Sequence, residues 1–308
     1  MNCSWLTLRD IEYLLAVAKN SHFAKAAEAC RVSQPALSTQ IKKFEDRLGV
    51  KIFERDNRNV KITEKGAEIL AQAQKIVDES SLLIEKAKMG SEPLSGPFRL
   101  GAIATIGPYF LPYVLAPLRK SYPRCQLFLE EGLTEGLLEK LSSGELDAVI
   151  AADSFQSERF EKHPLYFEPF LATVPKGHPF EKLRKISIKD LDAREMVLLE
   201  DGHCLSDQVL EICPKGKGMR RESFQSTSLE TLRYLVASGV GYTLMPQLAV
   251  NEDKKLKGLI TYVSFDKPVG RKVILVTRKI FSRKKDINTL LEVFKKSLPI
   301  SLGAGCLS

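Results

Sequence analysis

The sequence predicts an α/β protein built from a small helical module, one long helix and a larger two-lobed region. Three observations support this fold class. Apolar residues recur at helical spacing through the first 48 residues. A seam of apolar and small residues then continues from Ile69 to Ala87 at alternating steps of four and three. From Phe98 onward, strand-like and helix-like segments alternate.

Composition narrows the setting of this chain. Its 308 residues are 44% hydrophobic and 27% charged, which is typical of a soluble globular protein with about two domains. No apolar run approaches the roughly 18 residues of a membrane span, and the first residues do not resemble a signal peptide. We therefore expect a cytoplasmic protein with no membrane partner.

The six cysteines are too sparse and irregular for a secreted disulfide framework. In a reducing compartment, a disulfide would be transient or redox-sensing. No pair of ligands has the spacing of a zinc finger, so we expect neither a metal nor another cofactor.

The first 49 residues have the pattern of a helix-turn-helix. An amphipathic helix spans Leu8 to Ala18, a second begins near Phe23, and Ser33 is a suitable N-cap for a third that stops near Gly49. The third helix is expected to bury Leu37, Ile41, Phe44 and Leu48. The N-terminal part of this helix is expected to read base edges, and its lysine to bind phosphates. The residues expected to face DNA are Gln34, Pro35, Ser38, Thr39 and Lys42. The alternative is a plain helical bundle with a solvated basic face.

Two further segments favour the DNA-binding interpretation. Residues 53–63 read as two short strands around a turn, a wing that would place Arg55, Arg58 and Lys61 against the phosphates or the minor groove of DNA. From a Thr63 N-cap, a helix is expected to reach about Met89 and to pair two protomers along its seam. Residues 1–66 hold twelve Lys or Arg against eight Asp or Glu, so half of the net charge of +8 lies in about a fifth of the chain.

Residues 23–55, FAKAAEACRVSQPALSTQIKKFEDRLGVKIFER, resemble the winged helix-turn-helix of LysR-type transcriptional regulators. The resemblance implies a long linker helix and a two-lobed sensor domain like that of periplasmic binding proteins. The expected organisation is a winged helix-turn-helix at 1–63, a linker and dimerisation helix at 64–90 and a hinge at 91–97. Sensor lobe I is expected at 98–165 plus 270–300, and lobe II, with the redox switch, at 166–269.

In the α/β region, four predicted strand-to-helix junctions carry polar residues. These are Thr105, Thr134, His203 with Cys204, and Thr227. Ligands in open α/β sheets bind beyond the carboxyl ends of strands, so some of these residues are expected to line one pocket. For any single threonine the favoured role is to cap a helix, and Thr227 with Glu230 fits a capping box.

Residues 201–213, DGHCLSDQVLEIC, place one thiol directly after a histidine and a second thiol nine residues later. An imidazolium or a helix N-terminus beside Cys204 would favour its thiolate, which attacks peroxides. If both cysteines lie on one helix, they are about 13 Å apart, whereas a disulfide needs Cα atoms within about 7 Å. Forming the bond would then require refolding. The alternative is two buried, unreactive cysteines.

Residues 101–112, 200–208 and 226–233 resemble the hydrogen-peroxide-sensing members of the LysR type. That resemblance implies that Cys204 is the peroxidatic cysteine and Cys213 its disulfide partner. It also implies that Thr105, Thr134 and His203 bind peroxide. Asp207, Thr227 and Arg271 are implied as supporting residues around them. Two departures are Ser206, where an arginine is expected, and Ser223, where a histidine is expected.

The resemblance also implies a set of partners. They are promoter DNA, a second copy of the chain in a homodimer or homotetramer, hydrogen peroxide, a thiol reductant such as glutaredoxin or thioredoxin, and RNA polymerase. The chain is expected to be a regulator and not an enzyme. The sequence leaves two other hypotheses open: a regulator sensing a small metabolite between the lobes, and a thiol peroxidase with an accessory basic domain.

The wing assignment yields a first prediction. Arg58→Ala should weaken binding to every DNA sequence by a similar factor and flatten the salt dependence by about one phosphate contact, because the guanidinium neutralises a phosphate. Binding titrations at several salt concentrations measure both effects. A changed base preference with an unchanged salt slope would contradict the assignment.

Overall fold

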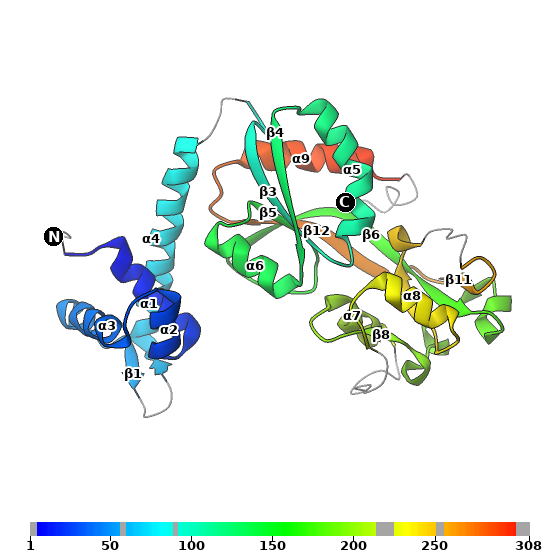
Figure 1. Ribbon diagram of the computed structural model, residues 1–308, viewed down its shortest axis with the longest axis horizontal. Helices are drawn as coiled ribbons and strands as arrows, with labels where there is room; N and C mark the ends of the chain where they lie inside the picture. The colour runs from blue at the N-terminus through cyan, green and yellow to red at the C-terminus, as the bar shows by residue number, and fades with distance from the viewer. Residues whose placement is uncertain (1–4, 56–59, 89–91, 214–224, 251–255, 300–308) are drawn as a thin grey trace. The chain divides into compact units, whose positions relative to one another are not determined.

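The structure is a computed structural model that describes residues 5–55, 60–88, 92–213, 225–250 and 256–299. The chain divides into two compact units, residues 1–89 and 90–308 (Figure 1). Within the described residues, no helix combines the length and apolar character needed to span a membrane.

The first unit is a winged helix-turn-helix followed by one long helix. Its elements are α1 (Leu8–Asn20), α2 (Phe23–Ala29), α3 (Gln34–Leu48), β1 (Phe53–Arg55), β2 (Val60–Ile62) and α4 (Glu64–Lys88). The Ser33 hydroxyl accepts from the Ala36 amide and caps α3, and Gly49 ends that helix in the left-handed conformation. Strands β1 and β2 pair antiparallel. The predicted turn of the wing lies outside the described residues.

The packing of α3 corrects one expectation. Leu37, Ile41 and Phe44 are buried, but Leu48 is 38% exposed. The chain reverses at Gly49, and the core next to the end of α3 is filled instead by Ile52, which is fully buried. Helical spacing alone could not reveal this competition.

A buried carboxylate ties the wing to α3. Glu45, 3% exposed, accepts hydrogen bonds from the amides of Ile52 and Phe53 at 2.8 and 3.0 Å. These bonds satisfy backbone donors that would otherwise be buried without partners. The position of the wing is therefore set by the helix expected to read DNA.

Helix α4 changes character along its length. Thr63 caps it by accepting from the Gly66 amide at 2.8 Å. Leu70 is buried in the hydrophobic core of the first unit, and Ala73, one turn later, is also buried. Further along, Leu83 and Ile84 are 72% and 51% exposed. The first half of α4 thus belongs to the winged module, whereas the second half leaves apolar side chains uncovered within the unit.

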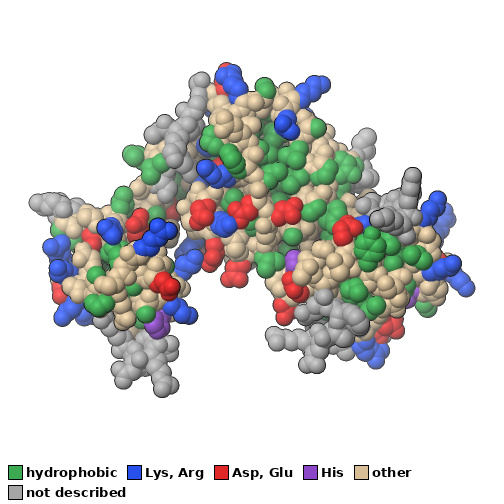
Figure 2. All heavy atoms as spheres, in the orientation of Figure 1, with side chains coloured by type: hydrophobic (Ala, Val, Ile, Leu, Met, Phe, Trp, Pro, Cys, Tyr) green, Lys and Arg blue, Asp and Glu red, His purple; other side chains and the backbone are tan. Residues whose placement is uncertain are grey.

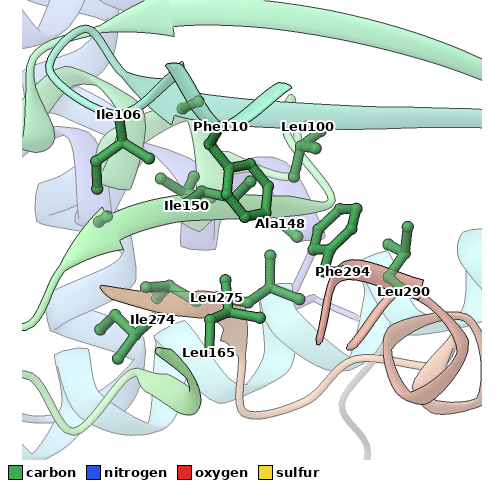
Figure 3. Packing of buried hydrophobic residues seen from close by; sticks show 14 of the residues in the cluster. Leu100, Ile106, Phe110, Ala148, Ile150, Leu165, Ile274, Leu275, Leu290 and Phe294 are labelled. Carbon is green, nitrogen blue, oxygen red and sulfur yellow. The ribbon is translucent and has the colours of Figure 1, made fainter. Parts of the chain in front are cut away.

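The second unit is built on one mixed sheet. It begins with β3 (Gly96–Ile103), α5 (Gly107–Ser121), β4 (Cys125–Gly132), α6 (Thr134–Ser143) and β5 (Ala148–Ala152), and it ends with β12 (Gly270–Arg278) and α9 (Lys284–Ser297). The strand order is β4-β3-β5-β12-β6-β11-β7, where β6 is Phe160–Pro175, β11 is Ile260–Phe265 and β7 is Lys185–Ile186, and β10 (Thr243–Pro246) also pairs with β6. In the core of lobe I, Phe110 meets the edge of Phe294 (Figure 3). Phe110 also stacks on Tyr166.

Lobe II is made of shorter elements. The strands are β7 (Lys185–Ile186), β8 (Leu198–Leu199), β9 (Gln225–Ser226), β10 (Thr243–Pro246) and β11 (Ile260–Phe265), and the helices are α7 (Cys204–Ile212) and α8 (Leu229–Ala237). Single-turn 3-10 helices lie at Pro179–Lys182, Ile188–Asp190, Ala193–Glu195 and Gln247–Ala249.

One long strand, β6 (Phe160–Pro175), joins the lobes. Its residues 160–169 pair with β12, and its residues 170–175 pair with β10 and β11. Only the second of these stretches reads as a strand from the sequence. The expected change of lobe between residues 165 and 166 falls inside β6, and the domain boundaries remain a prediction.

The first turn of α4 supplies a prediction about folding. A Cβ on Gly66 would lie 2.3 Å from the Ile52 carbonyl oxygen, so Gly66→Ala must push α4 away from the wing and should cost about 1–3 kcal/mol. Hydrogen exchange across residues 50–75 of the full chain should accelerate. Gly136→Ala in α6 is the matched control, because nothing lies within 4 Å of its Cβ. Equal protection in the two variants would contradict the close packing.

Candidate functional site

Cys204 is the first residue of α7, and His203 is its N-cap residue. The Cys204 thiol is half-buried and packs against the hydrophobic cluster of lobe I. Further along the same helix, Leu205 and Val209 are buried in the cluster of lobe II. Cys204 therefore lies where the two lobes meet, at a helix end whose backbone dipole favours a negative charge.

The loop before α7 touches the loop before α6. Gly202 has φ +97°, and a Cβ at that position would lie 3.1 Å from a methyl carbon of Leu133. Leu133 directly precedes Thr134, the first residue of α6. The backbone of Gly202 thus brings the helix starts that carry Cys204 and Thr134 to the same interlobe contact.

Thr105 is held by a buried ion pair. Arg271 donates to the Thr105 hydroxyl at 3.0 Å and to the Thr105 carbonyl at 2.8 Å. The same guanidinium donates from Nε to Glu168 at 2.8 Å, and all three residues are at most 3% exposed. Glu168 in turn accepts from the Leu248 amide at 3.1 Å. This network fixes the β3–α5 junction onto the strands that cross between the lobes.

Sequence reasoning missed Glu168. Its β6 position lies directly opposite Arg271 in the register of β6 and β12. The available signal was a lone charged residue in the otherwise uncharged, mainly apolar run from Tyr166 to Val174, since a charge is seldom buried without a partner. That signal was hidden because residues 160–169 do not read as a strand.

Cys213 lies at the opposite end of α7. It is 1% exposed, belongs to the lobe II cluster, and donates its S–H to the Leu191 carbonyl at 3.6 Å. Both Cys204 and Cys213 are free thiols. Nine residues of helical rise separate them by about 13 Å, beyond the roughly 7 Å that a disulfide allows. The structure therefore does not bring these two sulfurs together.

The other expected sensor residues differ in how exposed they are and in their place at helix starts. Asp207 is exposed in the first turn of α7, one helical turn after Cys204, and Thr134 is half-buried. Thr227 is exposed, and its expected capping role is wrong, because Ser228 accepts from the Thr231 amide at 3.2 Å as the N-cap. The N-cap needs extended backbone just before the first turn, and α8 starts one residue later than expected.

Ser206, the first of the two departures from the peroxide-sensor pattern, has a structural contact. It is buried and donates to the Leu199 carbonyl at 2.9 Å, which fastens α7 to β8. Ser223, the second departure, lies outside the described residues.

The expected DNA-contacting residues lie along the start of α3 and on the wing. Gln34, Pro35, Thr39 and Lys42 are exposed, and Ser38 is half-buried. The backbone of Arg55 ends β1, and Arg58 lies outside the described residues. Lysine and arginine side chains spread over the visible face of the first unit (Figure 2). Among the described residues, no group of three or more His, Cys, Asp or Glu is placed to hold a metal ion.

Comparison with known families identifies the class of protein. Residues 8–67 match the bacterial regulatory helix-turn-helix of the lysR family, and residues 91–299 match the LysR substrate binding domain. The chain belongs to the LysR family of transcriptional regulators.

Within that family, the chain is similar to OxyR. It is 42% identical to the DNA-binding transcriptional dual regulator OxyR of Escherichia coli K12 over 87% of this chain and 88% of the relative. A full-length OxyR from Pseudomonas aeruginosa, in which aspartate replaces one cysteine, is 40% identical, with a TM-score of 0.65 over 95% of this chain and 98% of that one. An H2O2-bound cysteine-to-serine mutant of Corynebacterium glutamicum OxyR is 28% identical, with a TM-score of 0.61 over 94% and 92%.

The buried ion pair leads to a prediction about Cys204. Glu168→Gln removes the charge that holds Arg271, so Thr105 should shift, and oxidation of Cys204 by hydrogen peroxide should slow by about ten- to a hundredfold. Stopped-flow thiol loss measures this rate. Glu161→Gln, at an exposed position of the same strand, is the control and should react normally. Equal slowing in both variants would mean that the pair is not specific to the site.

Proposed function

We propose that this chain is a hydrogen-peroxide-responsive transcriptional activator, in which Cys204 is the peroxidatic cysteine and Cys213 its resolving partner. The observation that carries the proposal is the placement of the two thiols on one short helix. Cys204 lies at the helix N-terminus against lobe I, and Cys213 lies in the core of lobe II. The similarity to OxyR supports the assignment of peroxide as the signal.

The first step is oxidation of Cys204. Its thiolate attacks one peroxide oxygen, the O–O bond breaks, and the departing hydroxide takes up a proton to become water. Cys204 is left as a sulfenic acid. Hydroxyl donors such as Thr105 and Thr134 stabilise charge developing on the peroxide oxygens. His203 is the third residue proposed to hold peroxide, with Asp207, Thr227 and Arg271 in support.

The second step joins the two cysteines. The Cys213 sulfur attacks the Cys204 sulfur, the S–O bond breaks, and the sulfenic oxygen leaves as water with the thiol proton. Because the thiols start about 13 Å apart, α7 must unwind before the bond can close. Unwinding breaks the bonds from Ser206 to Leu199 and from Cys213 to Leu191.

Refolding of α7 provides the route from chemistry to DNA. The helix packs on both lobe clusters, so its loss changes the surfaces that those clusters support. Such a change would rotate the subunits of a homodimer or homotetramer and respace the paired helix-turn-helix units on promoter DNA. The exposed Leu83 and Ile84 of α4 suit the pairing of two protomers.

The proposal includes several other roles. Gln34, Pro35 and Ser38 read bases, while Thr39, Lys42, Arg55 and Arg58 contact the DNA backbone.

A thiol reductant such as glutaredoxin or thioredoxin returns the disulfide to two thiols, and RNA polymerase is the downstream partner. The protein acts in the cytoplasm as a regulator, without turnover as an enzyme.

The resolving role predicts a separation of reaction from switching. Cys213→Ser should lose the Cys204 thiol to peroxide at an unchanged rate, yet its DNA footprint should stay in the reduced pattern, because no disulfide forces α7 to unwind. Mass spectrometry of the sulfenic acid and footprinting with and without peroxide measure the two steps.

Cys125→Ser is the matched control for that variant. Burial raises the pKa of the Cys125 thiol, which lowers its thiolate fraction, so its loss should leave the switch intact. Normal switching by Cys213→Ser, or loss of switching in Cys125→Ser, would contradict the assigned disulfide.

A further inference from the structure

The acceptor that holds Cys213 belongs to a segment anchored by a second residue, Tyr242. Cys213 donates to the carbonyl of Leu191. The next residue, Asp192, donates its amide to the Tyr242 hydroxyl at 2.7 Å, and that hydroxyl lies 3.1 Å from the Asp192 carbonyl, to which it donates. The Cys213 thiol and the Tyr242 hydroxyl thus hold the two successive peptide groups on either side of Asp192.

Tyr242 also binds this segment through its backbone. Its amide donates to the Glu195 carbonyl at 3.0 Å, and its carbonyl accepts from the Val197 amide at 2.8 Å. Its side chain is 1% exposed. Its ring centroid lies 5.3 Å from that of His178 and 5.6 Å from that of Phe180. Tyr242 is therefore fixed at several points and can act as an anchor for residues 191–197.

The chemistry of the hydroxyl suits a permanent donor. Burial raises the pKa of the Tyr242 hydroxyl, the hydrogen bond with Asp192 only partly offsets this effect, and nearby Cys213 raises the pKa further. The phenol stays protonated at physiological pH and can donate to the Asp192 carbonyl throughout.

The anchored segment connects the two ends of α7. After Val197 the chain enters β8, and residues 200–203 then lead to Cys204 at the helix start. Leu191, at the other end of the segment, receives the thiol from the helix end. The same stretch of backbone therefore docks Cys213 and precedes Cys204.

We propose that Tyr242 is a positioning residue for the redox switch: it fixes the Leu191–Val197 segment as the docking site that retains Cys213 in the reduced protein. The inference rests on the proposed function, because it concerns the step in which Cys213 leaves its core position to reach oxidised Cys204. The anchor opposes that departure and delays disulfide formation without touching the peroxide reaction.

The size of the effect follows from a pre-equilibrium. Disulfide formation proceeds from the fraction of molecules in which Cys213 has left its docking site. The two hydrogen bonds of the Tyr242 hydroxyl go to Asp192 and act on Cys213 through the segment, so we take their effect on docking as one net hydrogen bond, which changes such an equilibrium by about fivefold. Removing the Tyr242 hydroxyl loosens the docking site and raises that fraction by a similar factor.

The test separates the two chemical steps. In Tyr242→Phe, the Cys204–Cys213 disulfide should form about fivefold faster after peroxide addition, as the fold-change of a single net hydrogen bond implies. In the double variant Tyr242→Phe with Cys213→Ser, Cys204 should be oxidised at the rate of Cys213→Ser alone. Tyr262→Phe removes another hydroxyl next to the same lobe II cluster, on β11, and should leave the disulfide rate unchanged.

Each outcome decides between the proposals. An unchanged or slower disulfide rate in Tyr242→Phe, with normal Cys204 oxidation, overturns the anchoring role and leaves the proposed function standing. An unreactive Cys204 in the unmodified protein overturns the proposed function itself.

If Tyr242→Phe does not fold, hydrogen exchange in the unmodified protein decides. The amide of Asp192, which donates to the Tyr242 hydroxyl, should stay protected in both redox states, because the anchor holds the segment after Cys213 has left. Loss of that protection on oxidation overturns the inference.

Discussion

The structure depends on one geometric constraint: a helix, while it is intact, holds two thiols farther apart than a disulfide can span. While α7 is intact, Cys204 and Cys213 cannot react with each other, so the reduced state is protected from accidental closure. Each thiol is also held by a different core, Cys204 against lobe I and Cys213 within lobe II. The same helix that keeps the sulfurs apart therefore couples any later change to the packing of both lobes.

This arrangement can act as a switch only if α7 has little stability of its own and the structure around it is rigid. Nine residues are too few for an isolated helix to be stable in water, so α7 depends on burial of side chains such as Leu205 and can open locally. The buried pair of Glu168 and Arg271 resists change, because breaking it leaves an uncompensated charge at a cost of about 3–5 kcal/mol. That pair fixes Thr105 and ties it to β6 and β12. A firm frame beside a marginal helix confines the motion to the helix.

Sequence reasoning anticipated much of the fold and less of the local contacts. The helix-turn-helix was predictable because Ser33, Pro35 and Gly49 mark local backbone states that short-range chemistry sets. The exposure of Leu48, the cap of α8 and the importance of Glu168 were not. The first depends on which of two nearby residues, Leu48 or Ile52, fills the core, the second on a one-residue shift at a helix end, and the third on a partner distant in the chain. The spacing of Cys204 and Cys213 carried structural information only through the assumed helix, which the structure contains.

The two steps of the proposed reaction need opposite properties from the protein around each thiol. The first thiol needs a frame that does not move, and Arg271 with its partners fixes the β3–α5 junction of the lobe against which Cys204 packs. The second thiol needs a site that it occupies firmly and can still leave, and a single S–H bond to Leu191 in an apolar core fits that need. Because the segment carrying Leu191 is fixed by Tyr242 and not by Cys213 alone, the site can persist after the thiol departs. The reduced structure then has a defined place to which Cys213 returns when the disulfide is cleaved.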